Sequence, residues 1–396
     1  MCENLHRPCR SGAAGRVRGS DPYRQRVTFA ERLPWRVAME RALYGPGGFF
    51  VSGAGPAAHF RTSVHASPVF SSCLLRLLDS VDRALGHPPR LDVVDVGAGR
   101  GELLRALLVG VSGTPTQPSP AAPVPLADRV RLIAVERAPR PEDLPAEIDW
   151  LDEIPERITG LLVATEWLDN VPLDLAGQTG GGWRHLLVDP TTGTESTGPP
   201  LPPEDADWLT RWWPTPTSPS PIREFASAGG PEPDMNLLIN EVVARAEIGR
   251  TRDEAWAEAV RRVERGLAVT VDYGHLRKER PVDGTLTGYR DGRQVPPVPD
   301  GSADVTAHVA MDSVASAGER VARCAYTLIS QRAALRALGA DGGRPPLSLA
   351  SRDPAGYIRA LAAASAVAEL TDPAGLGGHW WLLQPVGVTI DPAMAR

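Results

Sequence analysis

LDVVDVGAGRGELLRALL, residues 91–108, is the stretch that decides the fold of this chain of 396 residues. It begins with an apolar run typical of a buried strand, and it ends with leucines at helical spacing. Between the two lies a turn that contains Gly97, Gly99 and Gly101. A strand that passes through a glycine-rich turn into a helix predicts a cradle for a nucleotide.

The spacing of this turn indicates which nucleotide it binds. The dinucleotide pattern G-x-G-x-x-G would need its third glycine at Glu102, whereas the chain has Asp95-x-Gly97-x-Gly99-x-Gly101. Alternating glycines let the backbone approach a ligand closely, and an acid at the strand end suits a cationic nucleotide that bears an amino acid. We therefore expect S-adenosylmethionine (SAM) here. The alternative is a turn that only closes a strand–helix unit, for which three glycines in five residues are seldom needed.

The composition excludes several classes of protein. The chain has 42 basic and 48 acidic residues, a formal net charge of -6, so no diffuse nucleic-acid or membrane surface is indicated. No apolar run approaches the roughly 18 residues of a membrane span, and we expect a soluble, cytoplasmic protein. The four cysteines form neither a disulfide framework nor a pair at zinc-ligand spacing, so no metal site is predicted.

Acidic residues end several predicted strands. Asp95, Glu136, Glu166 and Asp272 each fall at or just past an apolar run. In a doubly wound fold these ends meet along the ligand-binding edge of the sheet, and an acid after the second strand binds the ribose hydroxyls. Glu136 is our candidate for that contact. In a third predicted strand, Ile148–Leu151, we expect Trp150 to flank the adenine.

Two further sites carry alternatives. Glu166 and Asp169 lie three residues apart past a strand at residues 161–165, where they can converge on one cavity, although both could also be helix N-terminal acids stabilised by the dipole. Thr62 and Ser63 close a glycine- and alanine-rich loop. They serve equally well as donors over a site or as the start of the next helix, Pro68–Leu85.

The alternation of strands and helices predicts an α/β fold with a doubly wound, mostly parallel sheet. We divide the chain into a flexible leader (1–22), an N-terminal helical segment with the glycine loop (23–88) and the first half of the core (89–173). An inserted lobe with a long helix (174–265) and the second half of the core (266–396) follow. The helix is expected at 235–264, broken near Gly249. Residues 284–309 are expected as a long loop, and Trp380–Val386 as a final strand at an edge.

Three tryptophans fall in the inserted lobe, Trp208, Trp212 and Trp213. They could line a groove over the strand ends, but we expect them to form the small lobe's own core.

Eight short motifs follow one another along the chain. They are ALY at 42–44 with the glycine loop after it, FRTS at 60–63, DVGAGRG at 95–101, VERAP at 135–139, TEWLDNVP at 165–172, VDYG at 271–274, GTL at 284–286 with YR at 289–290, and DVTAHV at 304–309. In this order they resemble the MidA family of SAM-dependent methyltransferases, from about Phe29 to Gln384. The mitochondrial members of that family are complex I assembly factors that act as protein arginine methyltransferases.

The resemblance implies a Rossmann-like methyltransferase core, a mostly parallel seven-stranded sheet, with an inserted substrate lobe. It implies that the glycine turn and Glu136 hold SAM, while Thr62, Ser63, Glu166 and Asp169 face the methyl group. Asp272, Tyr273 and Tyr289 are the candidates for substrate binding behind them. The substrate implied is a protein, with a respiratory-complex subunit as one candidate, and a homodimer is compatible with the family.

The chain departs from the family pattern at three positions. Val64 and His65 follow Ser63 where the family usually has proline and glutamate, Asp95 replaces a glutamate, and Asp291 stands where many relatives have histidine. These changes leave the cofactor cradle intact and concern the substrate side.

The predicted function is transfer of a methyl group to a protein side-chain nitrogen. A guanidinium acceptor would suit Glu166 and Asp169, because its planar fork binds paired carboxylates. Two other interpretations stay open. One is a SAM-binding assembly factor or scaffold without turnover, supported by the missing acid after Ser63. The other is a small-molecule methyltransferase whose tryptophan lobe encloses a flat substrate.

Overall fold

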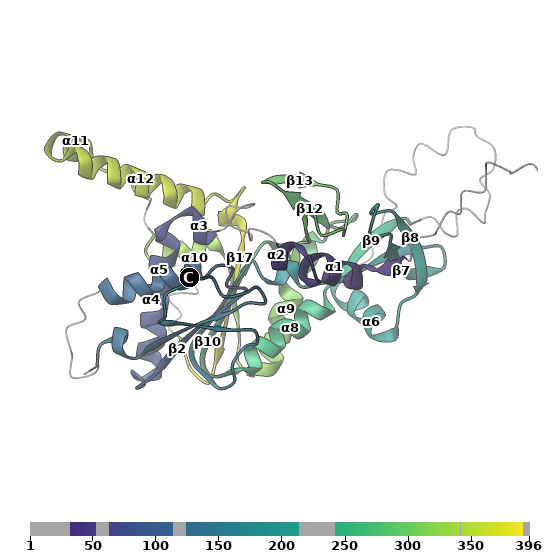
Figure 1. Cartoon of the computed structure of the whole chain (residues 1–396), viewed down its shortest axis with the longest axis horizontal. Coiled ribbons are helices and arrows are strands. Elements are labelled where there is room, and N and C mark those ends of the chain that lie inside the picture. The colour runs from purple at the N-terminus through teal and green to yellow at the C-terminus, as the bar shows by residue number, and fades with distance from the viewer. Residues whose placement is uncertain (1–31, 53–62, 114–123, 214–241, 341, 391–396) are drawn as a thin grey trace, which may run out of the picture.

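The computed structural model describes residues 32–52, 63–113, 124–213, 242–340 and 342–390. Across this part of the chain the fold is α/β, with helices on both faces of a central sheet (Figure 1). The leader at 1–22 lies outside the described residues. Within them, no helix combines the length and the apolar character needed to cross a membrane.

The central sheet has seven strands within the described residues, in the order β16-β17-β10-β5-β2-β3-β4. Their bounds are β16 Thr327–Ser330, β17 Trp380–Val386, β10 Val263–Asp272, β5 Ile158–Thr165, β2 Leu91–Val96, β3 Val130–Val135 and β4 Ile148–Leu151. Strands β10 to β4 run parallel, whereas β17 is antiparallel to both of its neighbours, so the sheet is mixed. The carboxyl ends of β2, β3, β4, β5 and β10 therefore meet at one edge.

The expectation that Trp380–Val386 lies at an edge is wrong. It pairs with β10 on one side and with β16 on the other. The edge strand on this side of the sheet is β16, which the sequence did not suggest because its four residues, TLIS, show no apolar alternation.

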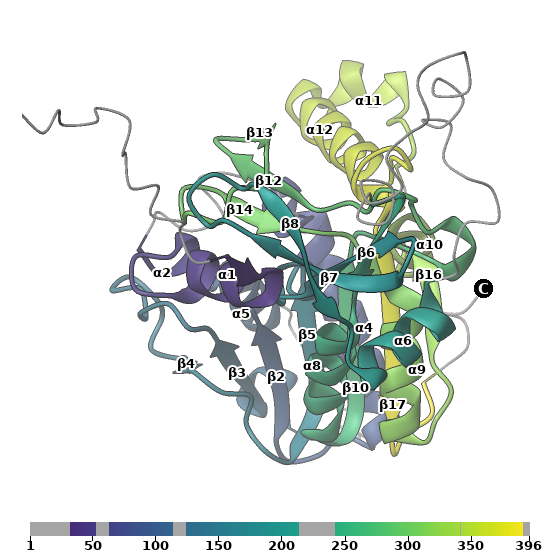
Figure 2. The same ribbon diagram turned by 90° about the vertical axis from the view of Figure 1, so that its right-hand side faces the viewer.

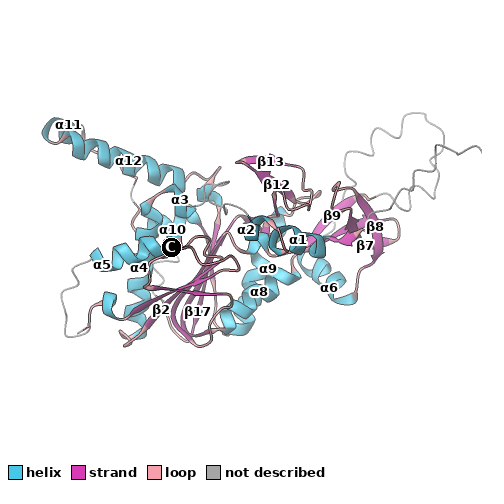
Figure 3. Ribbon diagram, viewed as in Figure 1, coloured by secondary structure: helices cyan, strands magenta, loops and turns pink. Residues whose placement is uncertain are grey.

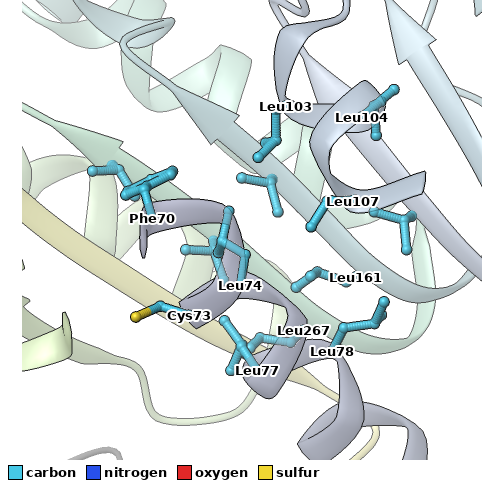
Figure 4. Close-up of a cluster of buried hydrophobic side chains, with 14 of the residues drawn as sticks. Phe70, Cys73, Leu74, Leu77, Leu78, Leu103, Leu104, Leu107, Leu161 and Leu267 are labelled. Carbon is cyan, nitrogen blue, oxygen red and sulfur yellow. The ribbon is translucent and has the colours of Figure 1, made fainter. Parts of the chain in front are cut away.

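Helices cover the two faces of this sheet. On one face lie α4 Pro68–Leu85, α5 Glu102–Gly113 and α10 Gln331–Ala337, and on the other α8 Arg250–Arg261 and α9 Met311–Ala322. Leucines spaced along α4 and α5 point at Leu161 of β5 and Leu267 of β10 (Figure 4). Ser67 caps α4 by accepting the Val69 N–H at 3.1 Å.

The inserted lobe is built on a second sheet, in the order β1-β7-β6-β9 with β8 on β7. Its elements are β1 Leu33–Pro34, β6 Asp174–Thr179, β7 Gly182–Val188, β8 Glu195–Pro200, α6 Pro203–Trp212 and β9 Ala244–Ile248. Trp208 and Trp213 are buried against Ala246 and Ile248, so the tryptophans do form the lobe's own core.

The helix predicted for residues 235–264 is wrong in its first half. Residues 235–241 lie outside the described part, Ala244–Ile248 is the strand β9, and the helix α8 begins only at Arg250. Residues 244–248 form a strand because they pair with residues 174–178 of β6. This tertiary pairing overrides the helical propensity of alanine, arginine and glutamate in ARAEI.

Residues 284–309 are not a loop without its own structure. They contain β12 Thr287–Arg290, β13 Arg293–Val295 and β14 Asp304–Thr306, which form a small sheet, and Val309 begins β15 Val309–Ala310, which pairs with β11 Gly274–His275. Asp291 and Gly292, with φ of 52° and 72°, make the two-residue turn between β12 and β13. Asp-Gly is a strong hairpin signal that the sequence already contained.

The remaining helices stand around this core (Figures 1 and 3). They are α1 Trp35–Tyr44, α2 Phe49–Ser52, α3 Ser63–Ala66, α11 Leu347–Arg352 and α12 Pro354–Leu370, with 3-10 turns at Leu126–Asp128, Leu168–Asn170, Arg277–Glu279 and Leu376–Gly378. In the predicted N-terminal helical segment, 23–88, the first helix starts at Trp35, and residues 23–31 lie outside the described part. Helices α11 and α12 project from the body (Figure 1).

Candidate active site

A cavity of about 1380 Å³ opens at the carboxyl ends of the parallel strands. Gly97 and Gly99 after β2, Glu136 after β3, Glu166 after β5 and Tyr273 after β10 all line it. Helix α1 lies across this edge of the sheet (Figure 2), and the β12–β14 sheet contributes Tyr289 and Asp304 to the wall. The volume exceeds the roughly 300–1,000 Å³ of a typical small-molecule site. It is therefore large enough for two ligands side by side.

The glycine turn forms one wall of the cavity. Gly97, Gly99 and Gly101 have φ of 73°, 58° and 81°, a conformation that favours glycine. A Cβ on Gly97 would lie 3.1 Å from Trp167 Cδ1, and one on Gly101 would lie 2.7 Å from Leu144 Cδ1. The turn thus packs tightly against its neighbours, and Gly101 serves this packing rather than the cavity wall.

Glu136 lies opposite the glycine turn and is tied to it. Its carboxylate accepts the N–H of Gly99 at 3.0 Å, of Arg137 at 2.7 Å and of Ala138 at 3.1 Å. The side chain also lines the cavity. A carboxylate held in this way can accept hydrogen bonds from the hydroxyls of a ribose.

Asp95 lies beneath the turn, outside the cavity lining. It is 2% exposed, and its Oδ1 has no hydrogen-bond partner. Burial, together with the nearby carboxylates of Glu102 and Glu136, raises the pKa of Asp95 to about 8. Below about pH 8 Asp95 is therefore held mainly in its neutral form.

Glu166 and Asp169 lie on a tight turn that packs directly against the glycine turn through Trp167. Glu166 adopts a φ of 50°, unusual for a residue with a side chain, and its carboxylate accepts the Ser63 N–H at 3.2 Å.

Asp272 supports this turn from outside the cavity. Its carboxylate accepts the N–H of Leu168 at 3.0 Å and of Asp169 at 3.3 Å. Asp272 is buried outside the cavity lining and shapes the turn. Burial and the Asp169 charge raise its pKa well above the usual range.

Asp169 is the most deeply enclosed acid of the lining. Its Oδ2 accepts hydrogen bonds from the Tyr273 hydroxyl and from Thr306 Oγ1, the latter at 2.9 Å, while its buried Oδ1 has no partner. Burial raises the pKa of Asp169 against the opposing effect of these donors. The rings of His308 and His379 flank Tyr273, with centroids 5.1 and 5.6 Å away.

Arg252 and Asp304 were not singled out from the sequence. Buried Arg252 donates to the carbonyls of Val171 at 3.1 Å, Ala307 at 2.9 Å and His308 at 3.0 Å, and also to that of Asp169. Asp304 accepts the Asn170 Nδ2 at 2.6 Å. Arg252, at the start of α8, thus joins the 169–171 turn to residues 307 and 308, and no local sequence pattern indicates these contacts.

The other predicted site residues lie as follows. Thr62 is outside the described residues. Ser63 begins α3, is fully buried and bonds through its hydroxyl to Gln331. Trp150 donates its indole N–H to Ala138 O at 3.1 Å and is not part of the cavity lining. The acids that follow it, Asp152 and Glu153, do line the cavity, as acids past the end of β4 could have suggested.

The described residues contain no group of histidines, cysteines or acids that could hold a metal ion. The site therefore consists of a glycine turn with one acid opposite, next to a second set of acids and tyrosines.

Comparisons with known proteins identify the family and the fold of the chain. A family model described as "Putative S-adenosyl-L-methionine-dependent methyltransferase" matches residues 75–329, more than half of the chain. A COG1565 superfamily member from Burkholderia thailandensis, solved with S-adenosyl-homocysteine bound, superposes with a TM-score of 0.69 at 24% identity, over 92% of this chain and 91% of that one. No curated protein matches the chain.

A native structure of a COG1565 superfamily protein from the same organism superposes with a TM-score of 0.63 at 23% identity, over 92% of this chain and 90% of that one. At these identities the two structures show a shared fold and nothing further.

Proposed function

Since the chain belongs to this methyltransferase family, we propose that it is a MidA-type enzyme that transfers a methyl group to a side-chain nitrogen of a protein, with arginine as the acceptor. The cofactor of the family is SAM, and the related Burkholderia structure contains its demethylated product. The protein substrate and the choice of arginine are the parts proposed here.

The residues of the cavity fit SAM. The left-handed glycines leave one wall free of side chains, and the Glu136 carboxylate is directed to that wall by three backbone N–H groups. These residues would hold the cofactor, and Asp152 and Glu153 lie at the end of β4 along the same cavity.

The observation that carries the proposal is the contact between the two turns. Trp167 packs on Gly97, so Glu166 and Asp169 on either side of it are placed next to the cofactor cradle. When bound, SAM supplies an electrophilic methyl group on a sulfonium. Glu166 and Asp169 orient a guanidinium and offer negative charge where cationic charge develops on the acceptor. Asp272 fixes the backbone of their turn, while Tyr273 and Thr306 fix the Asp169 carboxylate.

The tryptophan lobe does not support a small flat substrate. Trp208 and Trp213 are buried in the lobe's own cluster, and the described lining of the cavity includes neither of them. One observation still favours a SAM-binding scaffold without turnover: His65 stands where the family usually has an acid.

The test is methyl transfer from radiolabelled SAM to arginine-bearing peptides, with the product identified by mass spectrometry. We expect Glu166→Gln to reduce the rate by about 10²- to 10³-fold, as loss of one transition-state contact does, while the SAM affinity stays within about threefold. Glu258→Gln is the matched control, because Glu258 lines the same cavity from α8 and pairs with Arg262. Its rate should change less than about threefold.

Three outcomes would contradict the proposal. Equal loss of SAM affinity and rate in Glu166→Gln would make Glu166 a cofactor residue. Methylation of another chemical group would reject arginine. Tight SAM binding with no methylated product in any peptide would favour the scaffold.

A further inference from the structure

Ser63 and Gln331 form a buried contact between two segments 268 positions apart. Neither side chain is exposed to solvent. The Ser63 hydroxyl lies 3.2 Å from Gln331 Oε1 and 3.1 Å from Nε2, within hydrogen-bonding distance of both ends of the amide. A buried polar pair of this kind is costly to leave unsatisfied, so each residue fixes the other.

The same serine also contacts Glu166. Its backbone N–H donates to Glu166 Oε1 at 3.2 Å. Glu166 has a long side chain on a residue with left-handed φ. Its carboxylate can bind an acceptor reproducibly only if something restricts its rotamers, and a charge-assisted hydrogen bond from a fixed N–H does so.

Gln331 is itself held from three directions. Its Oε1 accepts the indole N–H of Trp381 at 3.2 Å, its Nε2 donates to Leu370 O at 3.2 Å, and its own N–H donates to His379 O at 2.7 Å. The residue thereby joins the start of α10 to β17 and to the end of α12. It is a rigid support at the back of the site, outside the cavity lining.

We propose that Gln331 is a positioning residue for Glu166, acting through Ser63. This inference rests on the proposed function, in which Glu166 meets the cationic acceptor. Gln331 holds the Ser63 hydroxyl, Ser63 presents its N–H, and that N–H sets the orientation of the Glu166 carboxylate. The predicted hydroxyl donor at Ser63 thus works through its backbone, while its side chain serves as an anchor.

The experiment uses variants that separate the links. Ser63→Ala keeps the N–H and removes the anchor. Gln331→Met removes both amide contacts at similar volume, whereas Gln331→Glu keeps the acceptor oxygens for the Ser63 hydroxyl and the Trp381 indole. Gln384→Met is the matched control, because Gln384 is an equally buried glutamine on β17 whose bonds run to Cys324 O and Pro385 O.

Calorimetry with two probes reports the position of Glu166 without any methyl acceptor. S-adenosyl-homocysteine reports the cofactor cradle. Sinefungin, a SAM analogue with a primary amine in place of the transferred methyl, adds a cation on the acceptor side. Glu166→Gln should weaken sinefungin binding about tenfold, the usual size for loss of a charge-assisted contact, and leave S-adenosyl-homocysteine binding within about twofold.

Ser63→Ala and Gln331→Met should each weaken sinefungin binding selectively, by about three- to tenfold, and the double variant should be no weaker than the stronger single variant. Gln331→Glu should recover most of the affinity, and Gln384→Met should bind both probes like the wild type. Additive losses, or equal losses for both probes, would overturn the inference.

Hydrogen exchange of the Ser63 amide provides a second measurement, which does not depend on catalysis. Gln331→Met should speed exchange of this amide at least about tenfold relative to Gln384→Met. Unchanged exchange overturns the positioning role whatever Glu166 does. A second outcome also overturns the inference but leaves the proposed function standing. In it, Gln331→Met speeds exchange of the Ser63 amide, and Glu166→Gln weakens sinefungin binding, yet Gln331→Met binds sinefungin like the wild type. If Glu166→Gln binds sinefungin like the wild type, the proposed function of Glu166 fails instead.

Discussion

The two halves of the cavity are built in different ways. The half that we propose for the cofactor, called the cofactor half below, comes from one strand–turn–helix unit and from Glu136 at the end of the neighbouring strand, and its contacts are mainly backbone groups. The half that we propose for the methyl acceptor, called the acceptor half below, brings together Ser63, the 166–170 turn, Tyr273, residues 304–308 and His379. The first is local in sequence, and the second exists only after the whole chain has folded.

The halves also differ in electrostatics. On the acceptor side Asp169, Asp272 and Asp304 are all buried, and burial raises the pKa of each. Hydroxyl, amide and backbone N–H donors hold them, and Arg252 is the buried cation among them. Removing one partner of a buried acid costs much folding free energy. Substitutions in the acceptor half should therefore destabilise the protein more than substitutions elsewhere.

The largest effect is expected from Arg252→Met. The change leaves the carbonyls of residues 169, 171, 307 and 308 without their shared donor and removes the positive charge near Asp169. We expect unfolding free energy to fall by about 3–5 kcal/mol in chemical denaturation, the usual cost of breaking a buried charged network.

Its control is Arg261→Met on the same helix. Arg261 is exposed and pairs with the exposed Glu258, so its loss should cost no more than about 1 kcal/mol. Similar values for the two variants would show that the acceptor half is no more fragile than the surface.

Gly99→Val tests the cofactor half. A β-branched residue at a φ of 58° strains the turn and puts a side chain on the cavity wall. The Kd for SAM should rise at least about 100-fold, or about 2.7 kcal/mol, in calorimetry. Gly86→Val adds the same strain at a φ of 77° where nothing lies within 4 Å of the new Cβ, and it should bind SAM normally. Weak binding by both variants would mean that general strain, not the turn, controls affinity.

The contrast between the halves also explains what the sequence could predict. The strand ends, the glycine turn, Glu136 and the Glu166–Asp169 pair follow from patterns confined to a few residues. Arg252 and Gln331 do not, because their partners lie 39 to 268 positions away and are in part backbone carbonyls. The strand Ala244–Ile248 was missed for the same reason, since pairing with β6 overrides its local propensity.

Asp95→Asn separates burial from charge beneath the turn. Burial raises the pKa of Asp95 from the ordinary 3.8 to about 8 in the folded chain. Between these two pH values the folded chain therefore holds a proton on Asp95 that the unfolded chain has released. Its contribution to stability therefore falls as pH rises from 3.8 to about 8. Asparagine cannot ionise, and the variant should gain on the order of 1–2 kcal/mol relative to the wild type between pH 5 and pH 8, after allowance for relaxation around a buried charge. Denaturation curves at the two pH values check this, and a constant difference would contradict it.

Trp150→Phe should have the smallest effect. The sequence suggested adenine stacking, but the indole bonds to Ala138 O away from the cavity lining. We expect stability to fall by about 1 kcal/mol, the value of one hydrogen bond, and the SAM Kd to change less than about twofold. A tenfold loss of SAM affinity would restore the stacking interpretation.

One measurement tests the division of the cavity most directly, a calorimetric titration of SAM and S-adenosyl-homocysteine into the wild type, Gly99→Val and Glu166→Gln. We predict that the wild type binds both, that Gly99→Val loses both, and that Glu166→Gln retains both. Loss of binding in Glu166→Gln equal to that in Gly99→Val would merge the two halves into one cofactor site and contradict the account.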